Sequence, residues 1–221
     1  MIPLYDTIRS RRFPFVNWML ILANAAVFWF ELRIGEAALQ SFIFTWGLVP
    51  AQFLSAPADG WLTIFTSMFL HGGWFHLLSN MWVLYIFGDN IEDRVGAAPY
   101  LFFYLLSGAA AALLQIYITQ DSSVPMIGAS GAIAGVLGAY LISYPGARIA
   151  SLVPILFIFT IVDVPAILFL IFWFVSQLYS GLFAIQGGSA SGIAWWAHIG
   201  GFIFGLIMVS FFGRRTVYQG Y

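Results

Sequence analysis

Five polar side chains that could do chemistry lie in otherwise apolar sequence. His71 and His76 flank the start of one apolar stretch, and Asn80 follows His76 by four residues, which places these two on one face of a helix. Ser130 and His198 lie near the ends of two later apolar stretches. Serine is a weak nucleophile until a neighbouring base accepts its proton, and imidazole is such a base. Ser130 and His198 are therefore a candidate nucleophile and base, provided that the fold brings them together.

The composition indicates which kind of fold must position these side chains. Of the 221 residues, 62% are hydrophobic and 8% are charged, whereas soluble domains have about 45–50% apolar and about 25% charged residues. A formal net charge of −1 leaves no basic surface for nucleic acid, and the absence of cysteine excludes disulfides and cysteine-ligated metals. We therefore expect one all-α membrane domain over residues 1–221, with no cofactor and no metal.

Six stretches meet the requirement of a membrane-spanning helix for roughly 20 mostly apolar residues between helix breakers. The mixed stretch after the first, which contains Glu36, Pro50 and Gly60, is too broken to span and is expected at the membrane interface as the first outer loop. Asp163 before Pro165 is typical of a helix N-cap, so residues 149–162 are expected to lie along the surface. The predicted spans are residues 15–33, 73–88, 99–119, 129–144, 164–183 and 193–212.

The arginines predict the orientation, because the sequence has no lysine and basic residues accumulate on the cytoplasmic side of membrane proteins. Seven of the eight arginines fall on one side of the six-span arrangement, and only Arg33 falls on the other. Both termini of this multi-pass protein are therefore expected in the cytoplasm, and the cell (inner) membrane is the expected location. The seven are Arg9, Arg11, Arg12, Arg94, Arg148, Arg214 and Arg215.

The candidate side chains are expected at a similar depth below the outer surface. The span over residues 129–144 has 16 residues, or about 24 Å of helix, against a hydrocarbon core of roughly 30 Å, so Ser130 starts below the surface. Small residues follow Ser130 at four-residue intervals, and Gly201 and Gly205 follow His198 on one face. Faces without bulky side chains let membrane helices approach closely. The two helices are therefore predicted to bring Ser130 and His198 together.

These side chains fall in segments that resemble the motifs of the rhomboid family of intramembrane serine proteases. The match extends over essentially the whole chain, in the family's order, and corresponds to its six-span core form. The segments are His71 to Asn80 for HxxxxHxxxN, Glu92 to Gly96 for ExxxG, Gly128 to Gly131 for GxSG and Ala197 to Gly201 for AHxxG.

The resemblance implies a rhomboid-like bundle of six transmembrane helices that acts as a serine endopeptidase. Its substrates would be single-span membrane proteins, cleaved within their transmembrane segments near the outer face. The resemblance implies Ser130 as the nucleophile and His198 as the general base, a dyad because no span interior has an acidic residue near His198. A mobile cover over the site is expected at residues 186–192, whose composition is that of a flexible linker.

Further parts of the implied site stabilise charge and shape the cavity. A tetrahedral intermediate needs hydrogen-bond donors for its oxyanion, and the candidates are the Ser130 backbone N–H, the His76 ring and the Asn80 amide. His71 and Gly128 are expected to line the cavity. Nothing in the sequence identifies what orients His198.

Other classes of protein also place polar residues inside membrane spans. A channel or transporter usually has charged or discontinuous spans near the midplane and a repeat between its halves, and this sequence shows no such repeat. A catalytically silent rhomboid-like protein that binds membrane clients would keep the fold and lose the dyad, whereas Ser130 and His198 are both present. The silent client-binding protein is nevertheless the alternative function.

Overall fold

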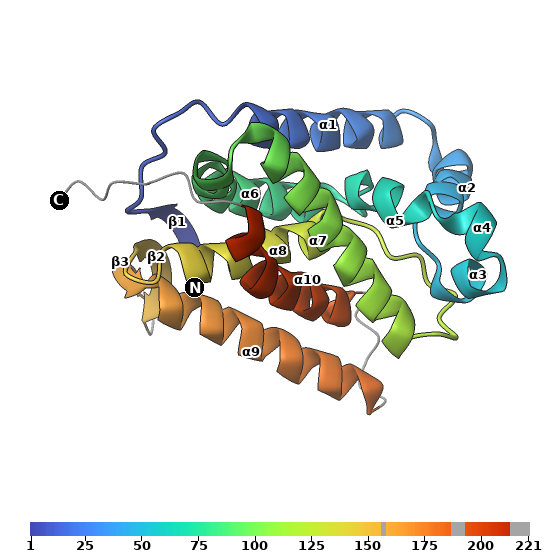
Figure 1. Cartoon of the computed structure of the whole chain (residues 1–221). Coiled ribbons are helices and arrows are strands. Elements are labelled where there is room, and N and C mark those ends of the chain that lie inside the picture. The colour runs from blue at the N-terminus through green and yellow to red at the C-terminus, as the bar shows by residue number, and fades with distance from the viewer. Residues whose placement is uncertain (156–157, 187–192, 213–221) are drawn as a thin grey trace.

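The computed structural model describes residues 1–155, 158–186 and 193–212, which are mainly helical (Figure 1). Short helices occupy the first outer loop, and longer helices form the body of the molecule. In chain order the elements are β1 (Ile2–Asp6), α1 (Phe15–Glu31), α2 (Glu36–Trp46), α3 (Pro50–Ser55), α4 (Pro57–Gly60), α5 (Thr63–Thr66), the 3-10 helix η1 (Ser67–Phe69), α6 (Trp74–Val95), α7 (Ala97–Ile118), α8 (Ser130–Ser143), β2 (Arg148–Ile155), β3 (Ile158–Pro165), α9 (Ala166–Ile185), α10 (Trp195–Met208) and the 3-10 helix η2 (Val209–Phe212).

Each predicted span overlaps one of the longer helices, namely α1, α6, α7, α8, α9 and α10. Within the described residues, three segments are long and apolar enough to cross a membrane by these criteria: α7, α9 and the continuous helix formed by α10 and η2. The helices α1 and α8 are apolar but shorter. The helix α6 continues to Val95, past the predicted end at Gly88. Gly88 lies within the helix as a close-packing position, because Asn17 and Tyr100 occupy the space that a side chain there would need.

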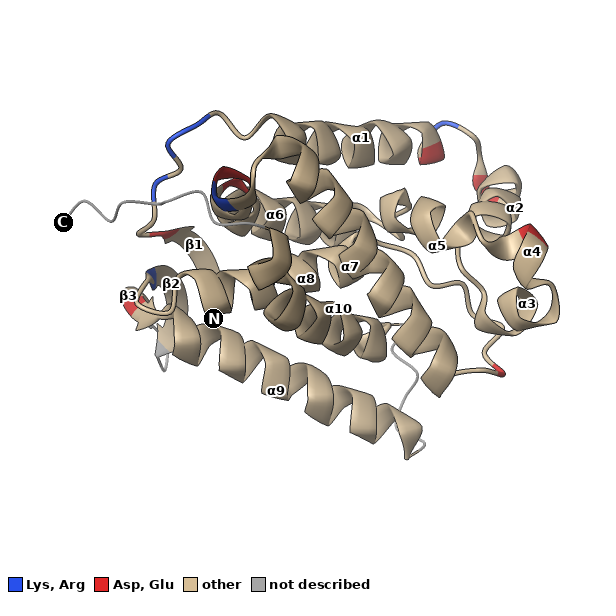
Figure 2. Cartoon of the chain, viewed as in Figure 1, with Lys and Arg blue, Asp and Glu red and all other residues tan. Residues whose placement is uncertain are grey.

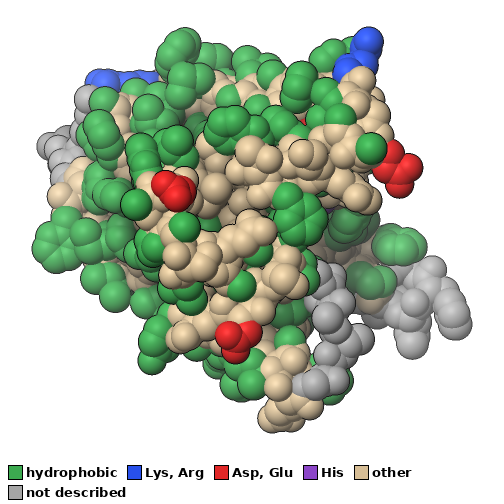
Figure 3. Space-filling model, turned by 90° about the vertical axis from the view of Figure 1, so that its right-hand side faces the viewer, with side chains coloured by type: hydrophobic (Ala, Val, Ile, Leu, Met, Phe, Trp, Pro, Cys, Tyr) green, Lys and Arg blue, Asp and Glu red, His purple; other side chains and the backbone are tan. Residues whose placement is uncertain are grey.

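The surface of the described chain matches a lipid environment around its middle and water at its ends. Large apolar side chains are exposed along the long helices, as at Leu168, Phe172 and Tyr179 of α9. Figure 3 views the end of the molecule that holds α2, α3 and α4, where apolar side chains alternate with polar groups, backbone and a few charged side chains. In Figure 2 the charged segments gather at two ends of the molecule. One end holds the chain before α1, the end of α6 and the β2–β3 hairpin, and the other holds the α1–α2 turn and α4. A bilayer around the apolar middle would leave both charged ends at its surfaces.

The helix α8 forms the centre of the bundle. Its ten consecutive residues from Gly131 to Tyr140 are all buried, and it packs against α6, α7 and α10. The residues of this helix are small or apolar on every side, so no polar face indicates a side that faces solvent. Its first residue, Ser130, is therefore held by protein on several sides.

Glycines let α8 and α10 meet backbone to backbone. A Cβ atom at Gly201 would overlap the carbonyl oxygen of Gly131, and a Cβ atom at Gly205 would overlap that of Gly135. The small-residue face predicted for the last helix is therefore confirmed as a contact face. On α8, the glycines one and five residues after Ser130 make this contact, and this places Ser130 at the edge of the α10 interface.

A three-stranded antiparallel sheet, in the order β1-β2-β3, lies at the end of the bundle where α9 begins (Figure 1). The expected fold is therefore mainly but not entirely helical, because residues 149–162, expected along the surface, lie in strands. The strands β2 and β3 pair from Arg148 opposite Pro165 to Ile155 opposite Ile158, and β1 pairs with β2. These strands are rich in isoleucine and valine, which favour a pleated surface, and the pairing satisfies backbone groups beside the apolar core.

The helix N-cap predicted at Asp163 is wrong. Asp163 lies in β3 opposite Ala150, and its carbonyl oxygen accepts a hydrogen bond from the Arg148 guanidinium (2.8 Å). The helix α9 begins at Ala166, after the N-cap residue Pro165. Proline has no N–H to donate to a strand ladder but is compatible with the start of a helix, so the strand ends there.

Glu92 joins α1 to α6. Its carboxylate accepts hydrogen bonds from the backbone N–H groups of Val16 (3.0 Å) and Asn17 (2.7 Å) in the first turn of α1. The carboxylate of Asp93 accepts one from the Arg11 backbone N–H (3.1 Å). A carboxylate at a helix N-terminus satisfies unpaired donors and interacts favourably with the helix dipole. The predicted charged cluster at the end of α6 therefore has a structural role.

Asp6 ties the sheet to the helices. Its carboxylate accepts hydrogen bonds from the Tyr140 hydroxyl and from the Asn90 side-chain amide (2.9 Å for the latter). Burial raises the pKa of Asp6 from 3.8 to about 7. The folded protein therefore retains a proton that the unfolded chain releases above about pH 4. The resulting stabilisation is fully present below about pH 4 and is lost as the pH rises to about 7.

This titration predicts a pH-dependent stability that the variant Asp6→Asn does not share. We expect the unfolding temperature of the wild type in detergent to fall by roughly 5 °C more between pH 4 and pH 8 than that of Asp6→Asn. Thermal unfolding followed by circular dichroism at a series of pH values measures the difference. Parallel curves for the two proteins would contradict the assignment to Asp6.

Candidate active site

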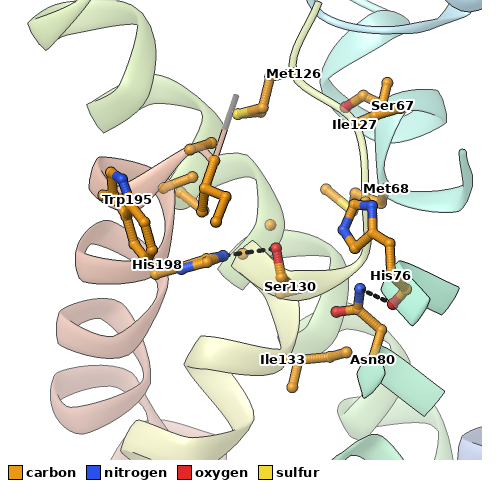
Figure 4. Close-up of a pocket in the computed structure, with 18 of the residues that line it drawn as sticks. Ser67, Met68, His76, Asn80, Met126, Ile127, Ser130, Ile133, Trp195 and His198 are labelled. Carbon is orange, nitrogen blue, oxygen red and sulfur yellow. Dashed lines mark hydrogen bonds between the residues drawn. The ribbon is translucent and has the colours of Figure 1, made fainter. Parts of the chain in front are cut away.

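A cavity of about 640 Å³ opens among α6, α7, α8, α9 and α10 (Figure 4). Most of its walls are apolar side chains from these helices and from the chain before α8. A few polar side chains interrupt these walls, and they come from four different helices. They include His76, Asn80, Ser130, Gln177 and His198.

The cavity brings together the two side chains that the sequence predicts as nucleophile and base. The Ser130 Oγ atom lies 2.7 Å from His198 Nε2. Ser130 is the first residue of α8 and stays partly exposed, whereas His198 in the first turns of α10 is buried. The predicted meeting of the two residues is therefore confirmed. A serine hydroxyl at this distance can donate its proton to Nε2.

Gly128 shapes the chain that leads into Ser130. Its φ of +117° lies in a region that favours glycine. A Cβ atom at this position would lie 2.6 Å from His76 Cε1 and Nε2, so the His76 ring packs directly on the backbone. The Gly128 N–H donates to the carbonyl oxygen of Ser67 (2.8 Å), which fixes this approach to α8. Gly128 lines the cavity, as predicted.

His76 and Asn80 lie across Ser130 from His198 (Figure 4). The Asn80 amide donates to the carbonyl oxygen of His76 (2.8 Å) one turn earlier in α6. The backbone N–H of Gly72 donates to His76 Nδ1 (3.4 Å), so a neutral ring carries its proton on Nε2. His76 and Asn80 therefore lie on the side of Ser130 opposite His198, with the Asn80 amide nitrogen bonded to the His76 carbonyl oxygen within α6.

His71 lies outside the cavity lining, contrary to the prediction. It is 2% exposed, and its ring lies edge to face with that of His76 at a centroid distance of 5.0 Å. Its backbone N–H donates to the Glu31 carboxylate (3.3 Å) at the end of α1. His71 therefore packs against the His76 ring outside the cavity lining, because the chain between η1 and α6 is bonded to Glu31 at the end of α1.

Gln177 is not among the predicted site residues, yet it contacts the histidine directly. Its Oε1 atom lies 2.7 Å from His198 Nδ1, the ring nitrogen opposite Ser130. Gln177 belongs to α9, and it is buried and lines the cavity. A polar side chain in an otherwise apolar span is costly unless it has a partner. That cost is the signal in the sequence that could have identified Gln177.

Two tryptophans enclose the His198 ring. The Trp195 ring lies edge to face with it at 6.1 Å, and the Trp173 ring is tilted against it at 5.9 Å. The position one turn after Ser130 in α8 holds Ala134. The aromatic contacts of His198 therefore come from α9 and α10 instead of α8.

Residues 187–192 of the predicted mobile cover lie outside the described residues, as do Arg214 and Arg215 of the predicted cytoplasmic set. Among the residues that the structure describes, no three histidine, cysteine or acidic side chains are grouped so as to hold a metal ion.

The protein is a mainly helical membrane bundle with a serine–histidine pair in an internal cavity. The family model described as Rhomboid domain matches residues 58–215, more than half of the chain. The chain belongs to the rhomboid family. It is an integral membrane protein in contact with the lipid bilayer.

Individual relatives match parts of the chain. "Putative rhomboid protease YdcA" of Bacillus subtilis is 31% identical over 132 residues, which are 59% of this chain and 63% of the relative. "Rhomboid protein 1, mitochondrial" of Saccharomyces cerevisiae is 32% identical over 104 residues, 45% of this chain and 29% of the relative. "Presenilin-associated rhomboid-like protein, mitochondrial" of Pongo abelii is 28% identical over 177 residues, 76% and 42% respectively. Each match spans less than two thirds of the relative's own length.

Proposed function

We propose that this protein is an intramembrane serine endopeptidase that uses Ser130 and His198 as a dyad. The observation that carries the proposal is the 2.7 Å distance between Ser130 Oγ and His198 Nε2 inside a cavity. Membership of the rhomboid family supports it, since one relative is named a rhomboid protease. The six-span arrangement of the bundle is part of the same proposal.

The reaction begins when Ser130 Oγ attacks the carbonyl carbon of a substrate peptide bond. His198 Nε2 takes the hydroxyl proton as the Oγ–carbon bond forms, and the carbonyl oxygen becomes an oxyanion. The imidazolium then returns the proton to the leaving amine as the carbon–nitrogen bond breaks, which leaves an ester on Ser130. A water molecule, deprotonated by His198, hydrolyses this ester and restores the serine hydroxyl.

The oxyanion requires donors that are in place before charge develops. We propose the Ser130 backbone N–H, the His76 Nε2–H and the Asn80 amide for this role; the His76 and Asn80 side chains lie on the side of Ser130 opposite His198 (Figure 4). Such donors act strongly in a site shielded from water.

Removing one oxyanion donor is expected to reduce turnover without preventing substrate binding. We expect His76→Ala and Asn80→Ala each to lower kcat by on the order of 100-fold to 1,000-fold with little change in KM. Initial rates of cleavage in liposomes give both constants, and thermal unfolding checks that each variant is folded. A folded variant with the wild-type kcat would remove that residue from the oxyanion hole.

The proposed substrates are membrane proteins with one span whose helix unwinds easily near the outer surface. A peptide bond within a helix is shielded by the helix's own hydrogen bonds, so glycine, proline or polar residues near the cleaved bond favour the reaction. We propose both termini in the cytoplasm of the cell (inner) membrane, which places the dyad toward the outer face. Residues 186–192 are proposed as the mobile cover.

The test is cleavage of a model single-span protein by the purified chain in liposomes, combined with covalent labelling. A fluorophosphonate probe is expected to attach to Ser130, and mass spectrometry of the labelled peptide identifies the site. Absence of cleavage together with substrate binding and no labelling at Ser130 would favour the catalytically silent client-binding protein. Labelling at a different serine would overturn the assignment of the nucleophile.

A further inference from the structure

Three side chains and one carbonyl group of α9 and α10 form a continuous series of hydrogen bonds behind the dyad. The Ser176 hydroxyl donates to the carbonyl oxygen of Trp173 (2.6 Å). The Gln177 amide nitrogen donates to the Ser176 oxygen (3.0 Å), and Gln177 Oε1 faces His198 Nδ1 (2.7 Å).

The direction of this series is determined at its far end. A backbone carbonyl can only accept, so the Ser176 proton points toward Trp173 and the Ser176 oxygen is left to accept. An acceptor at Ser176 selects the NH₂ group of the Gln177 amide, which turns Oε1 toward His198. Because Oε1 can only accept, His198 Nδ1 must carry the ring proton.

The proton on His198 Nδ1 determines the state of the opposite ring nitrogen, Nε2. A neutral imidazole with its proton on Nδ1 has a lone pair on Nε2, the atom that lies 2.7 Å from Ser130 Oγ. Gln177 thus selects the one neutral tautomer in which His198 can accept the serine proton. It also holds the ring plane, because the ring is bonded on both sides.

The structure assigns Gln177 as the positioning residue of the Ser130–His198 pair, the role that a carboxylate fills in a triad. This inference rests on the proposed function. In the described part of the chain, His198 has no carboxylate as a ring partner, and the described cavity lining contains no acidic side chain. Gln177 is 8% exposed, so water does not readily replace it at Nδ1.

Because the Gln177 side chain is neutral, an apolar and an acidic substitution are expected to change kcat and the pH–activity profile differently. Gln177→Leu keeps the approximate volume but removes the acceptor, so about 90% to 99% of the rings are expected to adopt the wrong tautomer or orientation. We expect kcat to fall by about 10-fold to 100-fold with KM within about twofold. Gln177→Glu restores an acceptor, so kcat is expected within about tenfold of wild type. Its negative charge stabilises the imidazolium, so the acidic limb of the pH–activity profile moves to higher pH.

A second glutamine provides the matched control. Gln115 of α7 accepts a hydrogen bond from the backbone N–H of Ala197 (3.1 Å), the residue before His198. Gln115→Leu therefore removes one glutamine contact to the same turn of α10 without touching the imidazole. We expect it to lower the unfolding temperature while leaving the pH–activity profile in place. Equal loss of kcat in Gln115→Leu and Gln177→Leu would reduce Gln177 to a structural contact and overturn the assignment.

Nitrogen NMR of ¹⁵N-histidine-labelled protein separates failure of this inference from failure of the proposed function. In the variant Ser130→Ala, which cannot form an ester, His198 is expected to carry its proton on Nδ1, and adding Gln177→Leu is expected to remove that preference. This readout does not depend on cleavage. If the wild type cleaves nothing but the Nδ1 proton responds to Gln177, the tautomer assignment stands and the proposed function fails. An Nδ1 proton unaffected by Gln177→Leu, or a wild-type kcat in that variant, overturns the inference.

Discussion

Replacing either Ser130 or His198 by alanine is expected to reduce cleavage of a single-span substrate by about 10⁴-fold or more. The two side chains share one proton across 2.7 Å, so loss of either leaves no activated nucleophile. Because they act as a unit, the double variant is expected to be no slower than either single one. Initial rates in liposomes, measured over a range wide enough to detect this residual activity, test the prediction.

The control for this experiment is a serine on the same helix. Ser143, in the last turn of α8, donates to the carbonyl oxygen of Ala139 (2.7 Å) and lies outside the cavity lining. Ser143→Ala is therefore expected to retain cleavage close to wild type. Substantial cleavage by folded Ser130→Ala, or by folded His198→Ala, would refute the dyad.

The second large effect is expected at the contact between α8 and α10. A Cβ atom in Gly205→Ala would overlap the carbonyl oxygen of Gly135, and backbone cannot move away as a flexible side chain would. The helices must separate, and a displacement of about 1 Å between catalytic groups can cost on the order of 100-fold in rate. We expect at least this loss of kcat, together with a lower unfolding temperature because overpacking destabilises a close-packed interface.

Gly146→Ala is the matched control, because nothing lies within 4 Å of the position that its Cβ atom would occupy. This substitution adds the same methyl group to the same chain without touching the α8–α10 interface, so activity and unfolding temperature are expected to stay near wild type. If Gly205→Ala cleaves at the wild-type rate, the close approach of the two helices is not required to align Ser130 with His198.

The site could be predicted where local sequence carries the information. Four-residue spacing places His76 and Asn80 on one helix face in any α-helix, and small residues beside His198 indicate a close helix contact. On α8 the predicted face of small residues is confirmed at Gly138, where a Cβ atom would overlap the carbonyl oxygen of Phe202 in α10. The contacts of Gly131 and Gly135 with α10 were less predictable, because apolar residues surround α8 on every side.

The strands and the helix start after them could not be predicted in the same way. A run of isoleucine and valine near a membrane is compatible with a surface helix or with a strand, and only pairing with another strand distinguishes the two. That partner is β1, which pairs with β2 although about 150 residues separate them, as in Ile2 opposite Leu152. Once β3 pairs through Asp163, this residue cannot act as an N-cap.

Residue types and spacing by themselves determined the membrane environment and the overlap of each expected span with a helix, and they marked Ser130 and His198 as candidates. The first two follow from hydropathy and helix periodicity, which act over neighbouring residues, whereas the contact between Ser130 and His198 also required the packing of α8 against α10. Only the tertiary structure decided that His71 packs against the His76 ring, that a sheet joins the bundle, and that Gln177 bonds the imidazole. The physical reason is that these contacts depend on how whole helices and strands rotate and dock against one another, and a hydrogen bond between Gln177 of α9 and His198 of α10 exists only after both helices have packed.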